Sequence, residues 1–159
     1  MTGSRSGTGV PLNMRGRDSM IPRIILLEDD ELVRMALTRA LLRRGFEVVS
    51  SPDPSICPVF RKFQSGGLGE KVLGDFLLTD NNMPFLNGLD LIAMQVEQGG
   101  RGGIRNKAVM SAAWDDDDLE KATRFGCQIF HKPLNIAEVY SWLERGKQSL
   151  RADRELVSL

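Results

Sequence analysis

The feature that most constrains the fold is an unbroken aliphatic run, Ile24 to Leu27, which ends abruptly in the acidic stretch Glu28 to Glu31. A strand with one wet face alternates apolar and polar side chains, whereas a strand covered on both faces of a parallel sheet can be apolar throughout. Directly afterwards, apolar side chains recur at the spacing of one helical face from Val33 to Leu41. The folded part of the chain therefore starts with a buried strand and a helix.

The same alternation continues to the end of the chain. Further strand-like runs lie at residues 46–50, 76–79, 108–111 and 129–131. Helical patterns fill the gaps. The second helix is expected to open at Asp53 and Pro54, and Pro58 soon afterwards predicts that it is shortened or bent. The last helix opens at Asn135 and is expected to bury Ile136, Val139, Tyr140 and Leu143. Five strand–helix repeats predict an α/β fold in which a doubly wound parallel sheet is flanked by five helices.

Composition and pattern divide the chain into three parts. With 159 residues, of which 42% are hydrophobic, there is enough material for one domain with an apolar core. Residues 1–22 are rich in Gly, Ser and Arg without apolar periodicity, which predicts a disordered tail or a segment added for expression. Residues 23–147 form the predicted domain. Residues 148–159 are expected to extend the last helix or to form a tail.

The charges and cysteines narrow the partners and the compartment. Lys plus Arg and Asp plus Glu each number 21, which argues against nucleic acid or an anionic membrane surface as a partner. No apolar stretch approaches the roughly 20 residues of a membrane span, and the N-terminal segment lacks the apolar centre of a signal peptide. Cys57 and Cys127 show no CxxC spacing, so both are interpreted as small buried residues. A cytoplasmic location is expected.

Polar residues end four of the five predicted strands. Because the carboxyl ends of parallel strands form one edge of the sheet, these residues should gather there. They are Glu28 and Asp29 after the first strand, Asp80 after the third, Ser111 after the fourth and Lys132 after the fifth. Three neighbouring carboxylates repel one another unless a cation joins them, and hard oxygen ligands of this number suit Mg²⁺. The sequence thus predicts a magnesium site.

Such a cluster has a natural reaction. An oxygen of Asp80 can attack a phosphoryl group and form an aspartyl phosphate while the metal spreads the developing charge. Lys132 can neutralise the remaining phosphoryl oxygens, and the Ser111 hydroxyl can donate a hydrogen bond to one of them.

The motifs that carry this chemistry resemble those of response regulator receiver domains of two-component signalling. They are RIILLEDDELVR (Arg23 to Arg34), DNNMPFLNG (Asp80 to Gly88), VMS (Val109 to Ser111) and HKPL (His131 to Leu134), and they occur in the family's order. The resemblance covers Arg23 to about Gly146. It implies the flavodoxin-like fold with five strands in the order 2-1-3-4-5.

The resemblance also implies a role for each site residue. Asp29 would bind Mg²⁺ directly and Glu28 mainly through water, Asp80 would be both metal ligand and phosphoacceptor, and Asn82 would offer its backbone carbonyl to the metal. Ser111 would be the switch hydroxyl and Lys132 the phosphate-pairing lysine, with a cis bond to Pro133.

A function in signalling follows from the same resemblance. The domain would be a signalling phosphoacceptor rather than an enzyme in the usual sense, although it would catalyse its own Mg²⁺-dependent phosphorylation and dephosphorylation. It would take phosphate from a histidine kinase or a histidine phosphotransfer protein. It would then present a switched surface of helix four, strand five and helix five to a downstream protein, without direct contact to nucleic acid or membrane.

Two features depart from the family pattern. The interval from Asp29 to Asp80 is longer than in compact members, and we place the extra residues around Gly66 to Gly74. The aromatic residue that commonly reports phosphorylation is replaced by Ile129, and Phe130 can take its place only if the strand register shifts by one.

Other readings of the same residues stand beside this one. A Mg²⁺-dependent phosphatase of the haloacid dehalogenase type would also form an aspartyl phosphate, but it needs a second Asp where this chain has Asn82. A receiver-like binding module that is never phosphorylated is the other alternative. The run Asp115 to Asp118 is interpreted as a helix start, and His131 is expected to point away from Asp80.

Overall fold

The sheet has five parallel strands in the order β2-β1-β3-β4-β5 in a computed structural model that describes residues 20–66, 68–97 and 103–159. The strands are β1 (Arg23–Leu27), β2 (Glu47–Ser51), β3 (Phe76–Asp80), β4 (Asn106–Ser111) and β5 (Gln128–His131). This arrangement confirms the predicted doubly wound fold and its strand order. All of the predicted tail except residues 20–22 lies outside the described residues.

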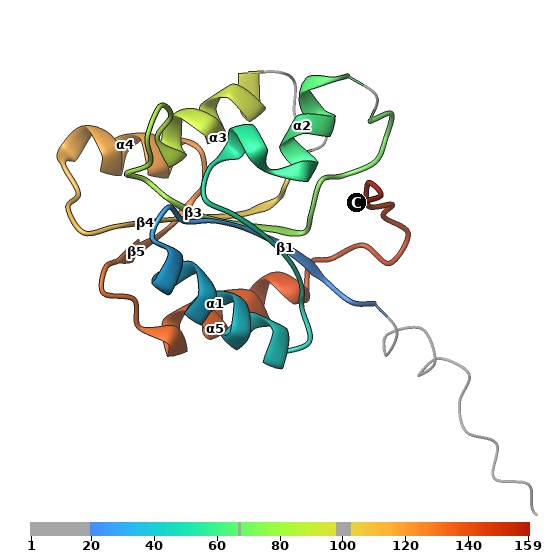
Figure 1. The fold of residues 1–159 in the computed structure, drawn as a ribbon, viewed down its shortest axis with the longest axis horizontal. Helices are drawn as coiled ribbons and strands as arrows, with labels where there is room; N and C mark the ends of the chain where they lie inside the picture. Colours follow the sequence, from blue (N-terminus) through green and yellow to red (C-terminus); the bar gives the residue numbers. More distant parts are fainter. Residues whose placement is uncertain (1–19, 67, 98–102) are drawn as a thin grey trace, which may run out of the picture.

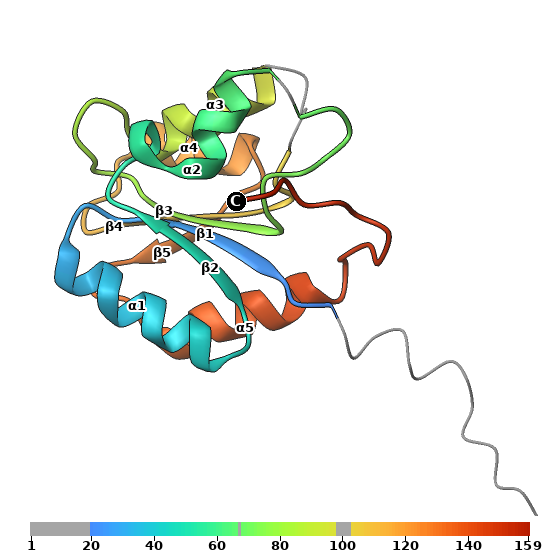
Figure 2. The same cartoon turned by 45° about the vertical axis from the view of Figure 1, so that its right-hand side comes forward.

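Helices cover both faces of this sheet. They are α1 (Glu31–Arg43), α2 (Pro58–Gln64), α3 (Gly88–Glu97), α4 (Asp116–Arg124) and α5 (Ile136–Lys147), with a short 3-10 helix, η2 (Pro54–Ile56), before α2. In Figures 1 and 2, α1 and α5 lie on one face and α2, α3 and α4 lie on the other. The expected break in the second helix is thus a 3-10 turn followed by a separate α2.

The central strand β1 explains why the aliphatic run is unbroken. Ile25 and Leu27 belong to the core under α2, α3 and α4, whereas Ile24 and Leu26 belong to the core under α1 and α5. Successive side chains of a strand point to opposite faces, so a strand between two helical layers needs apolar residues at every position.

Three expectations about burial are wrong, and one of them concerns Tyr140, which is only partly buried against the core under α1 and α5. Ile136 is 37% exposed, because all of the first turn of α5 lies in solvent and the helix reaches the core only at Val139. Cys127 is only partly buried, while Cys57 is fully buried as expected, and both thiols are free.

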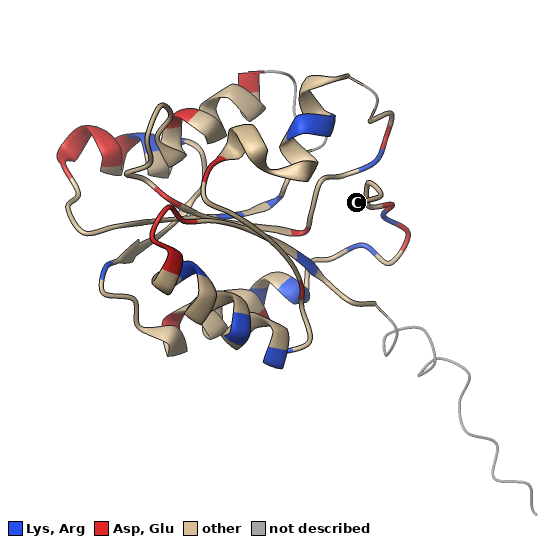
Figure 3. Cartoon of the chain, viewed as in Figure 1, with Lys and Arg blue, Asp and Glu red and all other residues tan. Residues whose placement is uncertain are grey.

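Acidic side chains gather where two helices begin. Figure 3 shows Asp and Glu at the start of α1 and of α4, while several Lys and Arg lie on α1 and α5. Carboxylates at a helix N-terminus interact favourably with the helix dipole.

Of the helices that the structure describes, none is long and apolar enough to cross a membrane.

Residues 148–159, here called the C-terminal strap, run back across the amino-terminal edge of the sheet. The N–H of Val72 donates to the carbonyl of Glu155 at 2.9 Å, and the N–H of Val157 donates to the carbonyl of Val72 at 3.0 Å. The side chain of Val157 is buried in the α2–α4 core beside Leu73. The strap therefore pairs with Val72, which belongs to the stretch where we predict the extra residues before β3.

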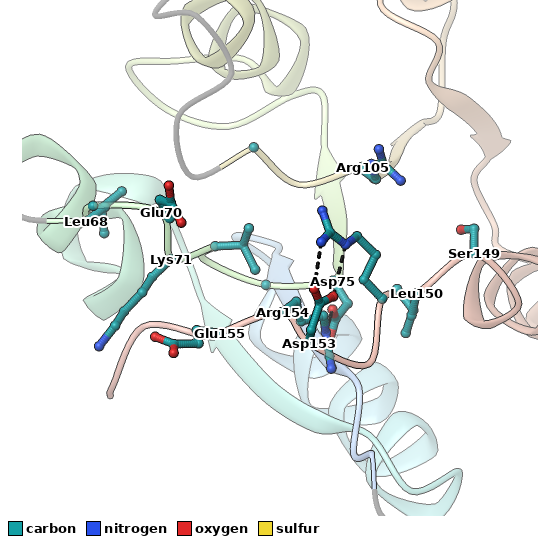
Figure 4. Close-up of a pocket in the computed structure, with 15 residues that line it drawn as sticks. Leu68, Glu70, Lys71, Asp75, Arg105, Ser149, Leu150, Asp153, Arg154 and Glu155 are labelled. Carbon is teal, nitrogen blue, oxygen red and sulfur yellow. Dashed lines mark hydrogen bonds and ion pairs between the residues drawn. The ribbon is translucent and has the colours of Figure 1, made fainter. Parts of the chain in front are cut away.

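A buried ionic network fastens the strap. The guanidinium group of Arg154 binds both carboxylate oxygens of Asp75, which also accepts a hydrogen bond from the backbone N–H of Arg23 at 2.8 Å. The side chain of Arg23 in turn donates to the carbonyl of Val157 at 2.7 Å and pairs with Glu47. Figure 4 shows the Asp75–Arg154 pair in the wall of a pocket of about 800 Å³ between the strap and the residues around Lys71.

We expect Arg154→Ala to lower the free energy of unfolding by about 3 kcal/mol, because the substitution leaves the buried Asp75 carboxylate without its ion-pair partner. Urea unfolding followed by circular dichroism measures the change. The matched control is Arg151→Ala, which breaks an exposed ion pair with Asp153 in the same strap and should cause no measurable loss. Equal effects of the two substitutions would contradict the role of the Asp75–Arg154 pair.

Candidate functional site

Four strands deliver the polar residues of the site to one edge of the sheet. Glu28 directly follows β1, Asp80 ends β3, Ser111 ends β4 and Lys132 directly follows β5. The strand register aligns these ends, since Asp80 lies opposite Met110 and Ser111 lies opposite His131. The structure thus brings these polar strand ends together as the sequence predicted.

Three carboxylates form the acidic part of the cluster. Glu28, Asp29 and Asp80 each offer a carboxylate oxygen, and these oxygens all lie within 4.8 Å of one another. Glu28 and Asp80 are buried, whereas Asp29 is exposed. Burial raises the pKa of Glu28 from 4.5 to about 7, and the nearby Asp80 carboxylate adds to the effect. Burial thus makes the charged form of Glu28 costly in the absence of further positive charge.

Lys132 supplies part of that charge. Its Nζ donates hydrogen bonds to Oε2 of Glu28 at 2.7 Å and to Oδ2 of Asp80 at 2.9 Å. Burial by itself would lower the pKa of Lys132, but the two carboxylates raise it above its ordinary value, so the ammonium form is retained. The Lys132–Pro133 peptide bond is cis, as predicted.

Ser111 and Asn82 complete the predicted set. The backbone N–H of Asn82 donates to Oδ1 of Asp80 at 3.0 Å, and its side-chain amide donates to Oγ of Ser111 at 3.1 Å. The Ser111 hydroxyl itself donates to the carbonyl of Ala113 at 2.8 Å. All six residues predicted for the site therefore lie in one connected group. Metal binding through the carbonyl of Asn82 stays a prediction.

Asn81 is a structural member of the site that the sequence analysis did not single out. It is buried, its Oδ1 accepts the N–H of Leu89 at 3.2 Å, and its Nδ2 donates to Oδ2 of Asp118 at 3.3 Å. These bonds tie the loop after Asp80 to the starts of α3 and α4. The Asp-Asn-Asn run looked like ordinary turn chemistry, so nothing in the sequence separated Asn81 from a solvent-exposed turn residue.

The loop after Asp80 also makes a close approach and carries a strained residue. A Cβ at Gly88 would lie 2.6 Å from the carbonyl oxygen of Asp80, so only glycine fits there. Phe85 has φ = 72° and a fully exposed side chain, although this backbone region is unfavourable for a bulky residue.

The run Asp115 to Asp118 and His131 have structural roles outside the carboxylate cluster, as predicted. Asp115 caps α4 by accepting the N–H of Asp118 at 2.8 Å. The exposed His131 ring lies against Trp114, with the ring centroids 6.4 Å apart. Neither belongs to the carboxylate cluster.

The register of β5 shows whether Phe130 can take the position of Ile129, where receiver domains commonly have an aromatic residue. Phe130 is buried in the α1–α5 core and packs edge-on against Trp142. Ile129 packs on the opposite face, against the α2–α4 core. No register shift moves Phe130 to the position of Ile129.

The sequence was compared with protein families and with curated proteins. No family model matches the sequence. The DNA-binding transcriptional regulator NtrC of Azospirillum brasilense is 34% identical over 127 residues, which are 79% of this chain and 24% of that protein. The chain thus spans about a quarter of the curated relative that it matches.

Solved structures match over most of the described chain. A response regulator receiver protein from Pseudomonas putida has a TM-score of 0.65 at 19% identity, and the match covers 80% of this chain and 98% of that one. The receiver domain of the Francisella response regulator 1452 has a TM-score of 0.63 at 16% identity, and that match covers 80% of this chain and 97% of the other. At these identities the likeness concerns the fold.

We expect Phe85→Gly to raise the free energy of unfolding by about 1 kcal/mol, because glycine adopts a positive φ without the steric cost that a Cβ brings. Thermal or urea unfolding measures the change. The matched control, Phe85→Ala, removes the same exposed ring but keeps the Cβ, so it should leave stability near that of the wild type. A gain as large in Phe85→Ala would contradict the strain argument.

Glu28 should also make the metal-free protein sensitive to pH. Its pKa rises from 4.5 in the unfolded chain to about 7 in the folded one, so the folded state binds the extra proton between these values. The wild type should therefore lose stability relative to Glu28→Gln as the pH rises through this window, and below it the difference should stay constant. Urea unfolding of both proteins in EDTA at a series of pH values tests this. A stability difference that does not depend on pH would contradict it.

Proposed function

Since the chain has the fold of a response regulator receiver domain, we propose that it works as one and accepts a phosphoryl group on Asp80. The observation that carries the proposal is the position of the Asp80 carboxylate. It lies beside the carboxylates of Glu28 and Asp29 and 2.9 Å from Nζ of Lys132. An anionic nucleophile, a set of oxygen ligands and a fixed cation thus meet at one point.

The residues present fit a magnesium ion. Asp29 and Asp80 would bind it directly, Glu28 would act mainly through water, and the carbonyl of Asn82 would add a neutral oxygen. The closeness of the three carboxylates, with oxygens within 4.8 Å of one another, supports this assignment, because hard oxygen ligands of this number suit Mg²⁺. When bound, the ion would neutralise these carboxylates and spread the charge of the transferred phosphoryl group.

The transfer itself uses Asp80 as the nucleophile. A carboxylate oxygen forms a bond to phosphorus, while the bond from phosphorus to the donor breaks and the leaving group departs with that electron pair. For a phosphohistidine donor, the departing imidazole is then protonated. Lys132 would stay close to the phosphoryl oxygens, and the Ser111 hydroxyl would turn to donate to one of them.

The proposed donor is a histidine kinase or a histidine phosphotransfer protein, and the proposed output is a protein contact. Phosphorylation would bias the surface of α4, β5 and α5 between two arrangements and so select a downstream protein. The exposed first turn of α5, which begins four residues after Lys132 along the chain, gives this surface a solvent-accessible part.

The phosphatase alternative finds less support in the site. Such an enzyme needs an acid–base group two positions after the nucleophile, and the side-chain amide of Asn82 does not ionise near neutral pH. Its side-chain amide is instead engaged by the Ser111 hydroxyl.

Incubation with acetyl phosphate and Mg²⁺ should add one phosphoryl group to the protein, which intact-mass spectrometry detects. The label should be lost in Asp80→Ala, which lacks the nucleophile, in Asp29→Asn, which lacks the proposed metal ligand, and after EDTA treatment.

Asp30→Ser is the matched control, because Asp30 only caps α1 and serine preserves the cap. It should be labelled like the wild type. A wild-type protein that stays unlabelled with Mg²⁺ would favour the non-phosphorylated binding module, and a label that persists in Asp80→Ala would remove Asp80 from the proposed role.

A further inference from the structure

Trp114 joins the loop that follows Ser111 to the edge strand β5. Its indole N–H donates a long hydrogen bond, 3.4 Å, to the carbonyl oxygen of Phe130, and its ring packs edge-on against His131. The side chain is half-buried and lies with Ile129 against the α2–α4 core. Trp114 therefore belongs to the loop between β4 and α4 and at the same time contacts β5, the strand that leads to Lys132.

The hydrogen bonds of Ser111 explain why this loop should respond to Asp80. A hydroxyl has one proton to donate, and Ser111 donates it to the carbonyl of Ala113 at 2.8 Å. The same hydroxyl oxygen accepts the N–H of Ala113 at 3.3 Å. If Ser111 turns to donate to a phosphoryl oxygen, the carbonyl of Ala113 loses its partner. Ala113 directly precedes Trp114, so the loop must rearrange beside the indole.

Few other contacts fasten this loop to β5. The backbone N–H of Lys132 donates to the carbonyl of Ser111 at 2.9 Å, which aligns the two strand ends but does not involve the loop. Ala112 and Ala113 have no polar side chain. Within the described residues, Trp114 therefore provides the side-chain hydrogen bond from this loop to β5.

We propose that Trp114 is a positioning residue that relays the occupancy of Asp80 from the Ser111 loop to β5 and to the start of α5. The relay rests on the proposed function, because it needs an anion on Asp80 to draw the Ser111 hydroxyl away from Ala113. Its weak hydrogen bond lets the indole shift at low cost. Trp142 packs on the other face of the sheet, between Phe76 and Phe130, and takes no part.

One ¹⁹F NMR experiment reads both the site and the relay. The full chain is labelled with 5-fluorotryptophan, its two resonances are assigned with Trp114→Phe, and Mg²⁺ with beryllofluoride is added as the phosphoryl mimic. Bound beryllofluoride gives its own fluorine signal. We expect the Trp114 resonance to move and the Trp142 resonance to stay in place. Trp142→Phe is the matched control and should leave the movement of Trp114 intact.

The relay is tested separately in Trp114→Phe, which keeps a ring but removes the hydrogen-bond donor. Its affinity for beryllofluoride should stay within about threefold of wild type, while the amide shifts at residues 129–131 on binding fall to about half or less. A Trp114 resonance that stays still while beryllofluoride is bound overturns the inference and leaves the proposed function intact. Undiminished amide shifts in Trp114→Phe overturn it as well. Absence of bound beryllofluoride overturns both proposals.

Discussion

The contact between Lys132 and two buried carboxylates organises the site. Glu28 and Asp80 come from different strands, and the Nζ of Lys132 lies within hydrogen-bonding distance of both. Without that cation, two buried negative charges would face each other in a poorly hydrated place, which is costly. Lys132 offers one positive charge to a cluster of three carboxylates, and the proposed magnesium site is argued from this difference.

The two edges of the sheet differ in how completely their charged side chains are paired. At the carboxyl edge, three carboxylates lie around Lys132, which pairs with two of them, and Phe85 holds an unfavourable backbone conformation. At the amino edge, the buried charges of Arg23 and Asp75 are both paired, with Glu47 and with the partly buried Arg154. A well-satisfied network stabilises one arrangement, whereas strain and unbalanced charge are typical of places where a protein binds or reacts.

Local patterns in the sequence predicted the sheet and the cluster, because both follow from the period of apolar residues and from where each strand ends. The aliphatic run Ile24 to Leu27 predicted a strand between two layers of helices. Because the carboxyl ends of parallel strands lie at one edge of the sheet, Asp80, Ser111 and Lys132 were expected to lie close together. The strap, Asn81 and Trp114 depend on contacts between distant parts of the chain, such as Val72 with Val157. No local pattern records those contacts, and for the same reason the exposure of Ile136 was mispredicted.

The hydrogen bond between Arg23 and Val157 affects the order in which parts of the nascent chain can fold. These residues lie 134 positions apart, and one belongs to the first strand of the sheet. During translation the amino edge stays incomplete until residues 154–157 have left the ribosome, after all five strands and α5, so Asp75 waits for the cation of Arg154. The nascent domain can therefore assemble its central strands first, but it closes this network only when the strap emerges from the exit tunnel.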